Sequence, residues 1–189
     1  MSRSTLIEVF QSKANWELEL SNSHGTAPLM WDFFYEKYCW NGDGWRQDIY
    51  GQGGATTFLR PFAIYMDSKQ LSAAFAKLSD FSVPLHHRAG LFLTADRVIL
   101  RTEDLEKLVE PFAILAHEMR GYSKPGFSNH WGAIADYVKA KAQKHDPRML
   151  GIALNCTSVS DVWDDYPDDT GIKGNSEELF TQATESEEK

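Results

Sequence analysis

Cysteine is scarce in this sequence, since Cys39 and Cys156 are the only two among its 189 residues. So few cysteines exclude the disulfide framework of a small secreted scaffold, and without a Cys-x-x-Cys pair they do not indicate a structural zinc site. The segment from Met1 to Gln11 lacks the apolar stretch and the small-residue cleavage site of a secretory signal. We therefore expect a cytoplasmic protein with two reduced thiols.

Long hydrophobic runs and familiar catalytic motifs are also missing. No stretch approaches the roughly 18 consecutive apolar residues of a transmembrane helix. No phosphate-binding glycine loop, nucleophile elbow or His-Glu-x-x-His zinc motif occurs. The pair His117-Glu118 comes near the zinc motif, but Gly121 stands where the second histidine belongs. Local motifs therefore predict no cofactor and no metal site.

Basic residues are too few at one end of the chain to balance the acidic ones. The sequence has 19 Lys and Arg against 27 Asp and Glu, a formal net charge of −8. Residues 160–189 hold ten of the acidic residues and two lysines, so this segment carries the whole −8 and residues 1–159 are neutral. Nucleic acids and anionic membranes need a basic surface. We therefore expect no direct nucleic-acid partner and no membrane partner.

What the sequence does contain is enough apolar surface for one folded domain. Hydrophobic residues make up 42% and aromatic residues 13% of the chain, and a chain of this length buries about 70% of its unfolded surface. We predict one compact domain over residues 1–159. An acidic C-terminal tail over residues 160–189 should be mobile or only loosely docked.

Hydrophobic periodicity predicts an α+β fold for this domain. Alternating residues from Trp16 to Leu20 indicate a strand, and stripes at helical spacing begin at Leu105 and Trp131. Pro111 lies inside the first stripe, which predicts a kink or two abutting helices there. Further strands are expected at 56–66, 90–94, 97–101 and 149–156, and further helices at 29–40 and from Ser68. Because strands and helices do not alternate strictly, we predict a mixed or antiparallel sheet packed by about four helices.

Two stretches combine aromatic side chains with features of a binding surface. Between Trp31 and Trp45 there are more aromatic residues than one helix face can bury, and exposed aromatics often anchor interfaces. In the acidic tail, aromatic residues stand among carboxylates that would suit a basic partner. The alternatives are a central helix covered on most sides and a merely solvating terminus. The candidate partner-binding residues are Trp40, Trp45, Trp163, Asp164, Asp165, Tyr166, Asp168 and Asp169.

The sequence leaves two functions open. The preferred one is a non-enzymatic binding protein that docks on or neutralises a basic protein, as an inhibitor or an immunity protein does. Bacterial immunity proteins against toxic nucleases share the acidic composition, and the analogy extends no further than composition.

The alternative function is a hydrolase, with or without a metal, whose site is assembled from dispersed residues. Its candidate residues are His86, His87, His117 and Glu118. His86 and His87 are expected in a loop after Pro84, with side chains that point apart if the chain is extended. Histidines that converge in a deep pocket would favour the enzyme, and a flat surface of acids and aromatics would favour the binding protein.

Overall fold

Five strands form one mixed sheet in the computed structural model, which describes residues 3–21, 25–39, 68–123, 128–156, 163–164, 166–168 and 171–181. The strands are β1 (Arg3–Val9), β2 (Ala14–Ser21), β3 (Val98–Arg101), β4 (Gly151–Cys156) and β5 (Gly174–Asn175). Their order in the sheet is β2-β1-β4-β3-β5. Neighbouring strands are antiparallel except β3 and β5, which are parallel. The predicted α+β fold with a mixed sheet is thereby confirmed.

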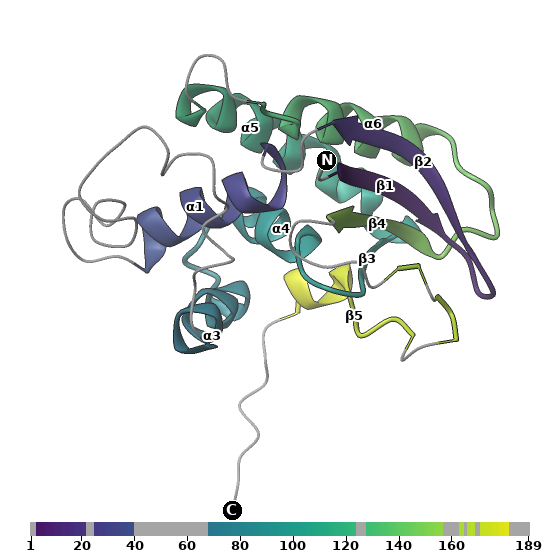
Figure 1. Cartoon of the computed structure of the whole chain (residues 1–189), viewed down its shortest axis with the longest axis horizontal. Coiled ribbons are helices and arrows are strands. Elements are labelled where there is room, and N and C mark those ends of the chain that lie inside the picture. Colours follow the sequence, from purple (N-terminus) through teal and green to yellow (C-terminus); the bar gives the residue numbers. More distant parts are fainter. Residues whose placement is uncertain are drawn as a thin grey trace, which may run out of the picture.

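Five α-helices accompany this sheet in the described part of the chain. They are α1 (Ala27–Tyr38), α3 (Ser68–Ala76), α4 (Leu85–Leu93), α5 (Leu105–Tyr122) and α6 (Trp131–Gln143). Short 3-10 helices lie at η4 (Lys77–Ser79), η5 (Thr102–Asp104) and η6 (Ser176–Leu179). Figure 1 shows α5 and α6 side by side along the sheet. None of the helices described is long and apolar enough to cross a membrane.

The main core lies between the helices and the sheet, and the most regular stripe of the sequence contributes much of it. Five residues of this stripe are fully buried: Leu105, Leu108, Phe112, Leu115 and Met119. The ring of Phe112 stacks on Trp131 of α6, with centroids 6.4 Å apart and ring planes inclined by 9°. α5 continues through Pro111 without a break, so two abutting helices do not occur. Burial on both sides of Pro111 outweighs the loss of one helical hydrogen bond.

The segment around Gly90 is helical, which corrects the sequence prediction. Strands are predicted at 90–94 and 97–101, but only the second is found, as β3. The residues from His87 to Leu93 are all buried, so α4 lacks the polar face whose period identifies a helix. β1 is a strand that the sequence did not predict. The predicted strand at 56–66 lies outside the described residues.

β4 is buried on both faces, as its unbroken apolar run predicts. Ile152 and Leu154 belong to the main core on the helix side of the sheet. Ala153, on the opposite face, belongs to a second and smaller apolar cluster with Ile7 and Trp163. The sheet is therefore covered on both sides where these strands meet.

The described C-terminal residues pack against the rest of the domain, by contacts that the sequence analysis did not predict. Trp163 is 2% exposed in the second cluster, and Leu179 is 1% exposed in the main core. The Ser176 hydroxyl donates to the buried Asp104 carboxylate at 2.7 Å. The Arg88 guanidinium donates to the Leu179 carbonyl at 2.9 Å. These contacts cannot be predicted from local composition, because each joins residues that are far apart in the sequence.

Candidate metal centre

Three helices bring ligand-type side chains together at one point of the molecule. His86 and His87 lie in the first turn of α4, Glu118 lies near the end of α5, and Tyr38 is the last residue of α1. One ligand atom from each of His86, His87 and Glu118 lies within 4.8 Å of the other two. We call these three residues the histidine–glutamate cluster.

A glycine explains why the helices come close enough for these side chains to meet. A Cβ atom built on Gly90 of α4 would lie 2.5 Å from Leu115 Cδ2 of α5 and 2.9 Å from Met30 Sδ of α1. His87 lies three residues before Gly90, and Glu118 lies three residues after Leu115. Residues three apart share one face of a helix, so the close approach at Gly90 places His87 opposite Glu118.

The contacts within the cluster centre on His87. Its Nε2 atom is hydrogen-bonded to Glu118 Oε2, and its Nδ1 atom is hydrogen-bonded to the Tyr38 hydroxyl. His86 Nε2 lies 3.5 Å from Glu118 Oε1, and the two histidine rings have centroids 4.0 Å apart. The His87 side chain is 2% exposed, whereas that of Glu118 is 35% exposed. The cluster is therefore sealed behind His87 and open to solvent at Glu118.

The burial of these groups shifts their protonation. It lowers the pKa of His87 to about 4, although the bond with Glu118 acts in the opposite direction. Burial alone would raise the pKa of Glu118, but the bond with His87 and the nearby Lys37 hold that pKa below its usual range. Burial, helped by the charge of Glu118, raises the pKa of Tyr38 to about 12. Near neutral pH the cluster thus holds an ionised carboxylate beside a neutral His87 and a neutral phenol, so Tyr38 is not an activated nucleophile.

The spacing of the ligand atoms suits a small cation. A tetrahedral zinc ion with bonds of about 2.0–2.1 Å separates its ligand atoms by about 3.4 Å. The 3.5 Å between His86 Nε2 and Glu118 Oε1 is close to this value. His86 Nε2 is also a buried atom without a hydrogen-bond partner among the described residues. A buried polar atom left in this state is costly, and a bound cation would satisfy it.

The structure unites three of the four residues predicted for a dispersed hydrolytic site. His86, His87 and Glu118 converge, whereas His117 is exposed and takes no part in the cluster. The expectation that His86 and His87 lie in a loop is wrong, because both belong to α4. Tyr38 was not predicted, and no local pattern in the sequence marks it out.

The predicted partner-binding residues are only partly described. Trp163 is buried and packs on Tyr166, with ring centroids 5.3 Å apart, so its indole serves the core rather than a free surface. The Tyr166 hydroxyl donates to the Phe10 carbonyl at 2.8 Å. Asp164 and Asp168 are exposed. The remaining candidates lie outside the described residues: Trp40, Trp45, Asp165 and Asp169.

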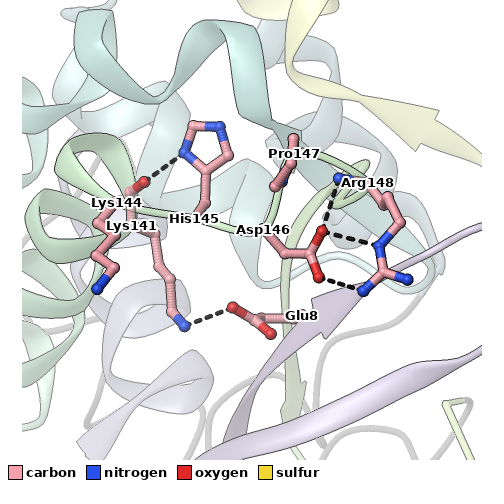
Figure 2. Close-up of a pocket in the computed structure, with 7 residues that line it drawn as sticks. All are labelled: Glu8, Lys141, Lys144, His145, Asp146, Pro147 and Arg148. Carbon is pink, nitrogen blue, oxygen red and sulfur yellow. Dashed lines mark hydrogen bonds and ion pairs between the residues drawn. The ribbon is translucent and has the colours of Figure 1, made fainter.

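A second group of charged side chains surrounds an open depression of about 660 Å³ beyond the end of α6 (Figure 2). Lys141 is bonded to Glu8 and lies 3.3 Å from Glu17. Arg148 donates two bonds to the Asp146 carboxylate, at 3.0 and 2.7 Å. Lys141 and Arg148 are therefore each paired with a carboxylate of this lining. Its lining residues are Glu8, Lys141, Lys144, His145, Asp146, Pro147 and Arg148.

Comparison of the chain with protein-family models, with curated proteins and with solved structures finds no match. We therefore infer a function from the geometry of the histidine–glutamate cluster.

Proposed function

We propose that this protein binds a divalent transition-metal ion through His86, His87 and Glu118 and uses it for hydrolysis. The observation that carries the proposal is the convergence of the three ligand atoms within 4.8 Å. A hydrolase was the alternative function predicted from the sequence. The proposed site keeps three of its four candidate residues and leaves out His117.

The chemistry of the ligands selects the kind of metal. Two imidazoles and one carboxylate suit zinc and similar ions, whereas magnesium and calcium prefer oxygen ligands alone. Three protein ligands leave a fourth position for water, as in catalytic rather than structural zinc sites. A bound zinc ion would supply a water molecule with a pKa near 7, the nucleophile that hydrolysis requires. The partly exposed Glu118 marks the side from which solvent and substrate reach this position.

Titration calorimetry of the intact chain with zinc chloride tests the binding step. We expect one equivalent of zinc to bind, and the His86→Ala variant to lose this binding. His117→Ala is the matched control, because His117 is exposed on the same helix as Glu118 and lies outside the cluster. Equal zinc binding by the wild type and His86→Ala would contradict the proposal.

Hydrolysis requires a separate assay. Zinc-loaded protein should cleave an activated ester or phosphodiester, such as a p-nitrophenyl substrate, and Glu118→Gln should abolish this cleavage. If the protein binds zinc in the cluster but cleaves neither substrate, the proposed metal site stands and the proposed hydrolytic activity is contradicted.

We also propose, as a second candidate, that the acidic surface docks on a basic protein in the cytoplasm, as the sequence analysis preferred. The described C-terminal residues leave four carboxylates exposed: Asp164, Asp168, Glu177 and Glu178. Charge of this kind raises association rates in a salt-dependent way. A doubly substituted Asp164→Asn, Asp168→Asn chain should associate more slowly with a captured basic partner at low salt, and an unchanged rate would contradict the proposal.

A further inference from the structure

His87 is held at both of its ring nitrogens. Nε2 is bonded to the Glu118 carboxylate and Nδ1 to the Tyr38 hydroxyl. The ring also packs edge-on against Phe33, with centroids 5.0 Å apart. The side chain is 2% exposed, so water has little access to either nitrogen.

Counting protons assigns the role of each atom in these two bonds. A neutral imidazole carries one N–H, and an ionised carboxylate can only accept. The ring proton must therefore lie on Nε2, which donates to Glu118. Nδ1 then accepts from the Tyr38 hydroxyl. In this tautomer Nε2 has no free lone pair and cannot bind a metal ion.

Metal binding at Nε2 requires the other tautomer. Nε2 loses its proton and Nδ1 gains one, so the charge of the ring does not change. Nδ1–H then needs an acceptor, since a buried N–H without a partner is costly. The Tyr38 hydroxyl can become that acceptor by turning its own proton away, because a hydroxyl both donates and accepts.

We propose that Tyr38 is a positioning residue that hydrogen-bonds His87 in both of its tautomers: its hydroxyl donates to Nδ1 in the metal-free protein and accepts from Nδ1–H when Nε2 binds the metal. This inference rests on the proposed metal site. Partners of this kind, which fix the second nitrogen of a metal-bound histidine, typically change metal affinity by about 10- to 100-fold.

The Tyr38→Phe variant tests the proposal, because phenylalanine keeps the ring and removes the hydroxyl. We expect zinc to bind to it about 10- to 100-fold more weakly than to the wild type. Tyr122→Phe is the matched control. The Tyr122 ring also packs edge-on against Phe33, with centroids 5.2 Å apart, but its hydroxyl donates to Glu36 rather than to His87. Its zinc affinity should equal that of the wild type.

Nitrogen chemical shifts of His87 give a readout that a purely structural role would not change. The metal-free wild type should show the Nε2–H tautomer, and the zinc-loaded wild type the Nδ1–H tautomer. Metal-free Tyr38→Phe should keep Nε2–H, because Glu118 still accepts from it, but its Nδ1 shift should move, since Nδ1 no longer accepts a hydrogen bond. Zinc affinity unchanged in Tyr38→Phe, or an Nδ1–H tautomer in the metal-free wild type, would overturn the role of Tyr38 and leave the metal site standing. A wild type that binds no zinc at the cluster would instead overturn the proposed function.

Discussion

The two ends of helix α5 hold carboxylates in different surroundings. Asp104, which precedes the helix, has a side chain that is 0% exposed and is fully paired. It accepts from Arg101 at 2.9 Å, from Lys107 at 3.1 Å and from Ser176 at 2.7 Å. Glu118, near the other end, faces two histidines.

The difference distinguishes a paired structural carboxylate from the carboxylate that we propose binds a metal ion. Two cations and a hydroxyl compensate Asp104, and its place before the first turn also suits the positive end of the helix dipole. It joins α5 to η6 through Ser176. The immediate partners of Glu118 are imidazole nitrogens, which carry a positive charge only when protonated. A carboxylate whose immediate partners are two imidazoles is the better candidate for binding a metal cation.

The largest expected difference between variants of the two carboxylates is in zinc affinity. Glu118→Gln removes a proposed ligand of the metal. Loss of a residue that only contacts a ligand weakens metal binding by up to about 100-fold, so we expect Glu118→Gln to weaken zinc binding by more than this. Asp104 precedes the opposite end of α5, so Asp104→Asn should leave zinc affinity unchanged in titration calorimetry. Equal losses in both variants would remove the functional distinction between them.

Stability should show the opposite order. Asp104→Asn removes the negative charge and replaces one of the two acceptor oxygens by an NH2 donor beside Arg101, Lys107 and Ser176. Loss of one member of a buried ion pair typically costs about 3–5 kcal/mol. Glu118→Gln keeps a polar group at a partly exposed position and should cost less than about 1 kcal/mol. Urea denaturation measures both free energies of unfolding. A larger loss in Glu118→Gln would contradict the assignment of Asp104 as the structural carboxylate.

His87 and Asp104 should also respond to acid in different pH ranges. The pKa of His87 is lowered to about 4 in the folded protein from an ordinary value of 6.5. The unfolded chain therefore binds more protons between these values, and stability should fall by up to about 3 kcal/mol as the pH drops from 6.5 to 4. The pKa of Asp104 is lowered from 3.8, since its bonds to Arg101, Ser176 and Lys107 outweigh the effect of burial, so its contribution is lost only at still lower pH.

A variant isolates the histidine contribution to this profile. Denaturation of His87→Gln between pH 4 and 6.5 should show a flatter dependence than the wild type. An identical slope would show that His87 does not carry the acid sensitivity in that range.

A smaller effect than that of Asp104→Asn is expected for Ser176. Its hydroxyl donates to Asp104 and accepts from the Arg101 backbone N–H at 2.9 Å. Ser176→Ala should cost about 1–2 kcal/mol, because the Asp104 carboxylate and the Arg101 backbone N–H each lose a partner while Asp104 keeps its cations. Thr181→Ala is a suitable comparison, since Thr181 lies beyond η6 and its hydroxyl bond, to the Glu177 carbonyl, is exposed. A smaller loss in Ser176→Ala than in Thr181→Ala would contradict the account.

The sequence predicted the elements whose periodicity is long and regular. The stripes that begin at Leu105 and Trp131 repeat often enough to distinguish helix from strand. The nine residues of α4 do not, because nearly all of them are buried and no polar face reveals the helical period. β1 was not predicted because Glu8 interrupts the apolar run of this strand. In the structure the Glu8 carboxylate is paired with Lys141.

The candidate site could be predicted only as a set of residue types. His86, His87 and Glu118 were identified as possible ligands, but their convergence depends on the packing of α4 against α5 at Gly90. Tyr38 joins them across 49 positions of sequence, and no local spacing announces such a contact. The C-terminal residues were assigned to a tail for the same reason, since the bonds of Ser176 span more than 70 positions.

The most direct test of the central claim is the anomalous diffraction of a zinc-loaded crystal. The account predicts one strong zinc peak about 2.0–2.1 Å from His86 Nε2, His87 Nε2 and a Glu118 carboxylate oxygen, and no peak there in Glu118→Gln. A wild-type crystal with zinc bound elsewhere and none between the three side chains would contradict it.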